Sequence, residues 1–402
     1  MPNTMNGRYS PLYFLAAVGA GGLVVTFFMY LMFWIPHPGQ PVPIFEDIQR
    51  AFTSGSIPTQ IAIVLGMMGI AVFGFLHYRL LFWNLGQLTQ FRKTEAYTKL
   101  LASNGETQLK AVPLTLAMSV NVAFIIGLVF VPKLWLIVEY LFPAALAVFS
   151  LIGLYALSLL AKFFGRVLVK GGFDLKANNS FAQLLPAFAL SMVAVGLAAP
   201  AALSANPIIV GISIVLATFF VVAALVVSVV ALVLGFSAML QNGTAPEAAP
   251  TLMVVVPIMT VLGIAILRMN HGLHVHFDVH AAKAETLVLL AQILSVQILF
   301  AVLGWLVLSK QNYVKTFLSS NGQRSAGSYA LVCPGVALSV MIHFFVNKGL
   351  VASGMIAKFG VAYWSLTTPA LILQAAMIVL VFSLNARHFG TSNKTANPVP
   401  AE

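Results

Sequence analysis

The chain has 402 residues, of which 60% are hydrophobic and 8% are charged, whereas a soluble domain carries roughly a quarter charged residues. This composition excludes a water-facing globule. The formal net charge is +11, but the cations fall in short loops between apolar stretches, so the sequence predicts no nucleic-acid interface. The single cysteine, Cys333, excludes an internal disulfide and a cysteine-based metal centre.

Ten stretches are long and apolar enough to cross roughly 30 Å of hydrocarbon as helices. The first is interpreted as a retained span, because it lacks the short apolar core and small-residue cleavage site of a signal peptide. The predicted spans are Pro11–Ile35, Ile57–Trp83, Ala111–Val131, Leu136–Phe164, Phe181–Leu203, Pro207–Leu240, Thr251–Met269, Ala284–Leu308, Ala326–Val346 and Gly360–Asn385. The predicted fold class is an all-α polytopic membrane protein with one ten-helix domain over residues 11–385.

The distribution of cations predicts the orientation of the spans. With ten spans both termini lie on the same side of the membrane, and fifteen of the 21 Lys and Arg residues fall on that side. Short cationic loops are retained in the cytoplasm. We therefore expect a cytoplasmic N-terminus over residues 1–10 and a cytoplasmic C-terminal tail over residues 386–402, the tail being disordered.

The loops and prolines indicate a repeated unit. Very short linkers follow the third and fifth spans, so the chain is interpreted as five antiparallel helical hairpins in series. Prolines recur in the odd spans at intervals of roughly 70 to 80 residues, which is typical of a degenerate repeat, and we expect them to kink those helices. The alternative is that proline is simply common in membrane helices. The prolines are Pro113, Pro186, Pro257 and Pro334.

Small and polar residues also gather on the odd spans, whereas the even spans are rich in Leu, Ile, Val and Phe. This difference predicts five kinked inner helices around a central pore and an outer ring of even helices that faces lipid. The candidate pore-lining residues are Gly22, Thr26, Ser119, Asn121, Ser191, Thr260 and Ser339.

The charges near these spans favour an anion as the transported ion. None of the ten acidic residues lies in the middle of a span, which argues against a proton-driven carrier and against a cation channel. Lys110, Arg268 and His343 lie near the ends of odd spans, where basic mouths would concentrate anions. The alternatives are that Lys110 and Arg268 reach toward lipid headgroups and that His343 is hydrogen-bonded to a neighbour.

The loop after the seventh span carries the one group of residues in the sequence that resembles a metal site. His271, His274, His276, Asp278 and His280 supply imidazoles and a carboxylate within ten positions, as zinc or copper requires. The alternative is that these side chains are solvated in an exposed loop. No phosphate-binding glycine loop and no Gly-x-Ser-x-Gly motif is apparent, so we predict neither an enzyme nor a cofactor.

One helix carries a resemblance to a known family. The segment LLPAFALSMVAVGLA, Leu184–Ala198, together with the five-hairpin plan, resembles the TehA tellurite-resistance and slow-anion-channel (voltage-dependent anion channel) family; SAGSYALVCPGVALSV, Ser325–Val340, resembles it more weakly. The resemblance implies a trimer with a pore through each protomer and Phe188 as the gate. The alternative is that Phe188, one of 30 phenylalanines, is a core residue.

Within this family the chain is most similar to a bacterial branch labelled TsoY, whose members are described as (seleno)proteins. This similarity implies a bacterial inner-membrane location and directs attention to Cys333, which otherwise is a small buried hydrophobe. Three functions are therefore compared. They are a passive or weakly coupled channel or transporter for a small anion, a secondary carrier for a small sulfur- or selenium-containing compound, and a membrane metalloprotein that uses the histidine cluster.

Overall fold

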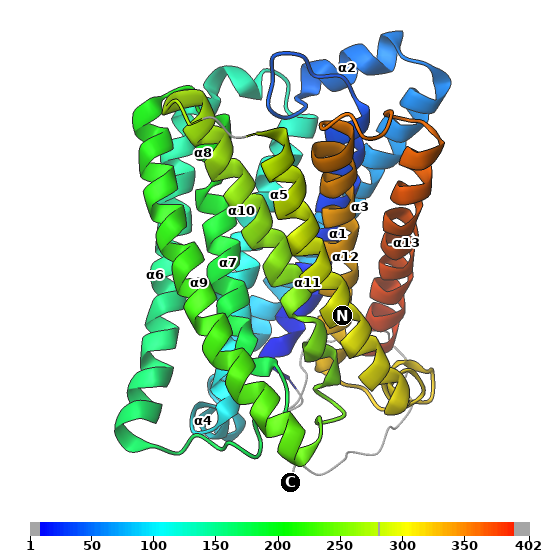
Figure 1. The fold of residues 1–402 in the computed structure, drawn as a ribbon. Helices are drawn as coiled ribbons and strands as arrows, with labels where there is room; N and C mark the ends of the chain where they lie inside the picture. The colour runs from blue at the N-terminus through cyan, green and yellow to red at the C-terminus, as the bar shows by residue number, and fades with distance from the viewer. Residues whose placement is uncertain (1–8, 280–281, 390–402) are drawn as a thin grey trace.

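The computed structural model describes residues 9–279 and 282–389, and these residues form helices and no strands (Figure 1). Within these described residues, ten helical segments are long and apolar enough to cross a membrane, which confirms the predicted number of spans. In chain order they contain α1 (Phe14–Trp34), α3 (Ile57–Phe91), α5 (Ala111–Phe130), α6 (Val138–Lys170), α7 (Leu185–Leu197) with α8 (Ala199–Leu203), α9 (Pro207–Asn242), α10 (Val255–His276), α11 (Lys283–Lys310), α12 (Val332–Phe344) and α13 (Val361–Phe389).

Two short helices mark the opposite ends of this bundle. Helix α2 (Phe45–Ser54) lies at one end and α4 (Glu95–Leu101) at the other (Figure 1), and we call these ends the α2 face and the α4 face. The described chain ends meet near the α4 face, where Trp83 lies 6.2 Å from Tyr9 and 4.8 Å from Phe389 between ring centroids. Helix α13 includes the first four residues of the predicted tail, and residues 1–8 and 390–402 lie outside the described residues.

Each odd span begins with a 3₁₀ turn and continues as an α-helix. The turns are η1 (Pro11–Tyr13), η2 (Asn104–Lys110), η4 (Ala182–Leu184), η5 (Ala249–Met253) and η7 (Ala326–Leu331). Pro113, Pro186, Pro257 and Pro334 occupy the first turn of the α-helix that follows. Amides in a first turn have no partner four residues earlier in the α-helix, so these prolines stand at a junction and not at a kink in the helix interior. The prolines inside α-helices are Pro143 and Pro369, both in even spans.

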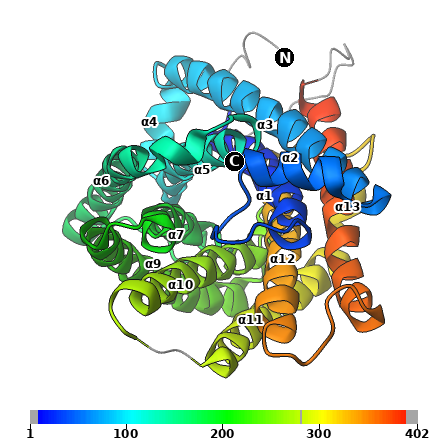
Figure 2. The ribbon, with the colours of Figure 1, turned by 90° about the horizontal axis from the view of Figure 1, so that it is seen from above.

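The odd and even spans differ in burial. The most apolar windows of the odd spans are 61–94% buried and those of the even spans 22–33%. Helix α1 packs against α5 and α12, α5 against α7, α7 against α10, and α10 against α12, so these contacts return to the first helix. Figure 2 shows the five helices toward the middle of the molecule. The even-span helices α3, α6, α9, α11 and α13 each pack against the preceding odd-span helix.

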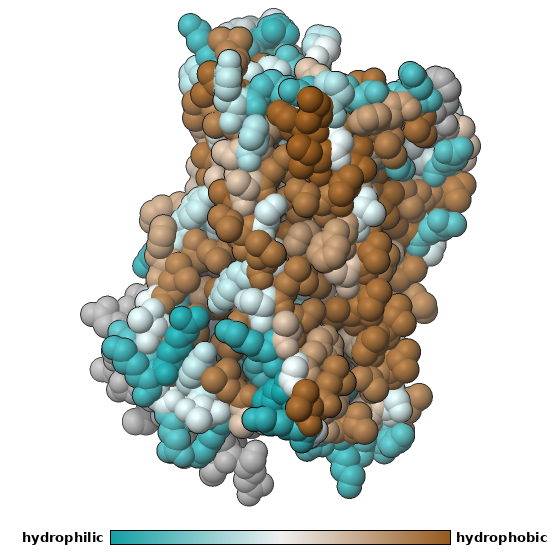
Figure 3. Space-filling view, turned by 90° about the vertical axis from the view of Figure 1, so that its left-hand side faces the viewer, coloured by the Kyte–Doolittle hydropathy of each residue, from teal (hydrophilic) through white to brown (hydrophobic). Residues whose placement is uncertain are grey.

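The lateral surface is apolar. Val215, Phe219 and Val222 of α9 are exposed, as are many other large hydrophobic side chains of the even spans. One side of the molecule is largely hydrophobic across its middle, and hydrophilic residues gather toward the two ends (Figure 3). A surface of this kind contacts lipid.

Glycines allow α1 and α12 to approach closely. A Cβ atom added to Gly19 would lie 2.7 Å from Cγ1 of Val332, and one added to Gly22 would lie 2.7 Å from Cγ1 of Val336. Gly196 of α7 likewise leaves room for the ring of Phe149. Small residues at helix crossings let membrane helices pack tightly.

Candidate functional site

A cavity of about 660 Å³ lies among α1, α5, α7, α10 and α12. It reaches the surface at the α2 face, where the exposed side chains of Asn270, His271 and Lys348 line it. Its volume falls within the range of small-molecule sites, roughly 300–1,000 Å³. The inner helices are therefore not packed solidly against one another.

The cavity ends before it reaches the α4 face. The lining residues nearest that face on the five helices are Val18, Met118, Phe188, Pro257 and Cys333. Beyond this level the 3₁₀ turns pack together, with η1 against η2 and η7, η2 against η4, and η5 against η7.

An aromatic cluster lies in the same region as these turns. The Tyr13 hydroxyl is 2.9 Å from Nδ1 of His388, and the rings of Tyr13 and Tyr329 are 6.1 Å apart between centroids. Among the described residues, the lining of the cavity does not continue through this region to the α4 face.

Phe188 lies at this closed end. It stands in the first turn of α7, lines the cavity and is 3% exposed. Its carbonyl oxygen accepts a hydrogen bond from the Ser191 hydroxyl at 2.9 Å. Met192, one turn further along α7, lines the cavity above it.

Arg268 brings a positive charge to the cavity wall. Nη1 of Arg268 donates a hydrogen bond to the carbonyl oxygen of Val195 at 2.7 Å. This carbonyl belongs to the last turn of α7, where the helix dipole attracts a cation. Among residues 9–279 and 282–389 the ion pairs are Arg50–Asp47, Lys99–Glu95 and Arg166–Glu106, and none of them involves Arg268. The charge of Arg268 is therefore not neutralised by a described carboxylate.

The mouth of the cavity is also basic. Lys348 and His37 line both the main cavity and a neighbouring pocket of about 470 Å³ on the α2 face, to which Lys358 contributes as well. Partial burial lowers the pKa of Lys358. The described linings of both spaces contain no Asp or Glu, so the potential along this route is positive.

The predicted pore-lining residues divide into two groups. Gly22, Asn121 and Thr260 line the cavity. The hydroxyls of the others donate to backbone carbonyls, Thr26 to Leu23, Ser119 to Thr115, Ser191 to Phe188 and Ser339 to Ala370, and these residues do not line the cavity. A serine or threonine in a membrane helix can satisfy itself in this way on any face.

Of the three basic residues expected at pore mouths, only Arg268 lines the cavity. Lys110 is 1% exposed and lies 5.2 Å from the ring centroid of Phe163 in α6. His343 is fully buried against Tyr30 and Trp34, and its ring nitrogens have no hydrogen-bond partner among the described residues.

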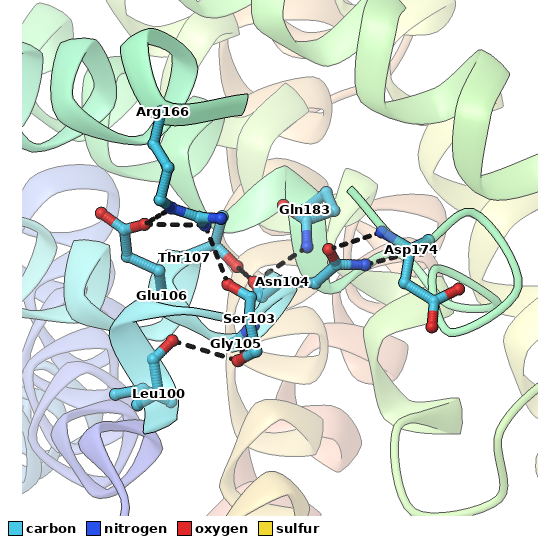
Figure 4. A network of polar contacts seen from close by, with 9 residues as sticks. All are labelled: Leu100, Ser103, Asn104, Gly105, Glu106, Thr107, Arg166, Asp174 and Gln183. Carbon is cyan, nitrogen blue, oxygen red and sulfur yellow. Dashed lines mark hydrogen bonds and ion pairs between the residues drawn. The ribbon is translucent and has the colours of Figure 1, made fainter. Parts of the chain in front are cut away.

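A polar network supports the α4 face near the start of α7 (Figure 4). Arg166 donates to the carboxylate of Glu106 at 3.0 and 3.1 Å and to the carbonyl of Ser103 at 3.1 Å. Asn104 exchanges hydrogen bonds with the backbone of Asp174, and its carbonyl accepts one from Gln183. The network ties η2 to α6, to the 171–181 loop and to η4, and thereby fixes the base of α7.

The histidine cluster does not form a metal centre in the described part of the chain, where no group of three or more His, Cys, Asp or Glu residues is placed to hold an ion. His274 Nδ1 lies 2.9 Å from the carbonyl of Val279, and His276 Nε2 lies 3.1 Å from that of Ser204. Asp278 is exposed and adopts a positive φ of 53°. His280 lies outside the described residues.

Sequence reasoning did not identify the apolar wall of the cavity. Phe28, Phe124, Phe149, Met29 and Met192 line it, but nothing in their spacing separates them from the other members of 30 phenylalanines and 15 methionines.

No protein-family model and no curated protein matches this sequence. The general class follows from the architecture, because ten apolar helices fit a membrane channel or transport protein.

Proposed function

We propose that the chain is a bacterial inner-membrane channel or weakly coupled transporter for a small anion. The inner odd spans form the pathway, the even spans shield it from lipid, and Phe188 is the gate. The observation that carries this proposal is Arg268, a cation without a described carboxylate partner in the wall of a cavity whose described lining has no acid.

The charge pattern supports an anion over a cation. An anion that enters from the α2 face meets Lys348 first and Arg268 deeper in the cavity. A cation is repelled along the same route, because nothing acidic in the lining offsets these charges. The pattern of a neutral passage with basic side chains is the one expected of anion pathways.

The position of Phe188 supports a gate. An aromatic ring in a narrow apolar constriction excludes hydrated ions by dewetting, and Phe188 stands where the cavity stops. The resemblance of Leu184–Ala198 to the TehA and slow-anion-channel family is in line with this role. From the same resemblance we propose a trimer of protomers, each with its own pathway, and from the cation distribution we propose that the α4 face is cytoplasmic.

Replacement of Phe188 with alanine tests the gate. Loss of the ring should widen the closed end, and we expect anion conductance in planar bilayers to rise at least tenfold in the Phe188→Ala variant. Phe82→Ala is the matched control, because Phe82 lies on α3, is 67% exposed and does not line the cavity. Equal currents in the wild type and the Phe188→Ala variant would remove the gate.

A carrier for a small sulfur- or selenium-containing compound is the second candidate. Cys333 and four methionines line the cavity, and a cavity open to one face is also the geometry of an alternating-access carrier. This candidate predicts saturable uptake that depends on an ion gradient. Flux that rises linearly with concentration and ignores gradients would argue against it.

A further inference from the structure

We infer that the anion recognised by this cavity is an organic monoanion with an apolar body, a carboxylate or a sulfonate, whose acidic group binds Arg268 and whose body packs against phenylalanine and methionine side chains. The inference rests on the proposed function and names the substrate class of the same site.

The size of the cavity favours an organic molecule. A volume of about 660 Å³ is typical of sites that enclose small organic ligands. A halide or a nitrate would occupy a small part of it, and the remainder would hold water against apolar walls, which is unfavourable.

The distribution of cations in the cavity favours a ligand with a single acidic group. Nη1 of Arg268 is held by the carbonyl of Val195, which fixes the orientation of the guanidinium. A guanidinium has five N–H donors in a planar fork, so donors remain for the two oxygens of a carboxylate or sulfonate. The other lysine or arginine of the lining, Lys348, is exposed at the mouth, so a second acidic group deep in the cavity would find no matching cation.

The side chains of the cavity wall favour a ligand whose body is apolar. Phe28, Phe124 and Phe149 contribute aromatic rings, and Met29 and Met192 contribute flexible thioethers. Aromatic and methionine side chains bind varied apolar shapes, because methionine can adjust its conformation to fill gaps.

The test measures binding of straight-chain carboxylates to the purified full-length protein in detergent at pH 7.5. The series runs from acetate through butanoate, hexanoate and octanoate to hexadecanoate, with the neutral amide of each length as its matched control and with chloride and nitrate as inorganic anions. We expect affinity to rise roughly fourfold per added methylene, which is the fold-change equivalent of ~0.8 kcal/mol per buried CH₂. We also expect each carboxylate to bind at least tenfold more tightly than its amide.

Variants separate the charged end from the apolar end. Arg268→Gln should remove the preference for carboxylate over amide and keep the dependence on chain length, and Arg268→Lys should retain part of the preference. Val25→Phe should lower the affinity for octanoate more than for butanoate, because Val25 lines the cavity. Val222→Phe is the matched control, since Val222 is 53% exposed on α9 and is not part of the lining.

The outcomes distinguish this inference from the proposed function. Conductance to chloride or nitrate together with carboxylate affinity that does not change with chain length would overturn the substrate class and leave the anion pathway standing. Affinity that continues to rise unchanged to hexadecanoate, in wild type and Val25→Phe alike, would indicate a lipid or detergent effect and would also overturn it. Absence of flux for every anion, in wild type and in Phe188→Ala, would remove the proposed function itself.

Discussion

Arg268 is the residue on which the electrostatics of the cavity depends. Its guanidinium is held at Val195 and meets no described carboxylate. At an effective dielectric constant of about 20, a unit charge about 6 Å away stabilises an anion by roughly 3 kcal/mol before desolvation is counted. One side chain can therefore set the sign of the permeant ion.

Removal of this charge should weaken ion selectivity. In Arg268→Gln we expect the ratio of anion to cation permeability to fall at least tenfold, because the described lining then has no Lys or Arg below the mouth. Reversal potentials in bilayers under a KCl gradient measure the ratio. Arg268→Lys serves as the charge-retaining control, and an unaltered reversal potential in Arg268→Gln would show that the selectivity arises elsewhere.

A residue of the candidate site could be predicted from the sequence only where its residue type usually has a single role in a membrane protein. Arg268 was expected at a pore mouth because cations are rare within membrane spans, and it does line the cavity, whereas Lys110 and His343, expected there as well, do not. Ser191 and Ser339 could not be assigned from the sequence, since a hydroxyl can bond to its own helix or to a neighbouring one. The buried position of Lys110 beside Phe163 depends on how α6 packs, which no local pattern encodes.

At the scale of the helices, the α1–α12 crossing depends on the absence of side chains. The distance of 2.7 Å from a Cβ on Gly22 to Cγ1 of Val336 is too short for any real contact. The crossing also shapes the cavity, because Gly22 and Val336 both line it.

Gly22→Ala should therefore destabilise the protein by about 1–3 kcal/mol, the usual cost of overpacking. Thermal unfolding in detergent measures the loss, and the double variant Gly22→Ala, Val336→Ala should recover most of it. Gly86→Ala in α3 is the matched control, because no atom lies within 4 Å of its added Cβ and alanine favours a helix. Equal melting temperatures for Gly22→Ala and Gly86→Ala would refute the close approach.

Hydropathy predicted the existence of the ten spans better than their ends. The second span was expected to end at Trp83, but α3 continues to Phe91, because a helix retains its hydrogen bonds after it leaves the hydrocarbon while its side chains become polar. Helix α2 was not predicted, since its ten residues are too few and too polar for a hydropathy signal. Its start is held by a hydrogen bond from the Ile44 amide to Asp47, and the helix packs on α3 and α5, with Glu46 accepting a hydrogen bond from the Lys133 amide.

At the scale of the whole molecule, the proposed orientation places the mouth of the cavity outside the cytoplasm. Lys358 is exposed on the α2 face and Lys176 is exposed in the loop that follows α6, near the α4 face. These two positions therefore report on opposite sides of the membrane.

Cysteine labelling tests the orientation. In a Cys333→Ala background, a membrane-impermeant maleimide should label Lys358→Cys in intact cells and should label Lys176→Cys only after permeabilisation. The native cysteine is buried but lines the cavity, so the background substitution removes it as a competing labelling site. Labelling of Lys176→Cys in intact cells, with Lys358→Cys protected, would reverse the proposed topology.

The lack of acidic groups in the described cavity lining also affects the energetics of anion transport across the membrane. No carboxylate there offsets the charge of a passing anion, so under the proposed function a monoanion that crosses without a coupled cation moves one net charge across the membrane. A membrane potential of about 100 mV, negative inside, contributes ~2.3 kcal/mol per unit charge. This corresponds to a roughly fifty-fold bias, and in a resting cell it would drive a monoanion outward.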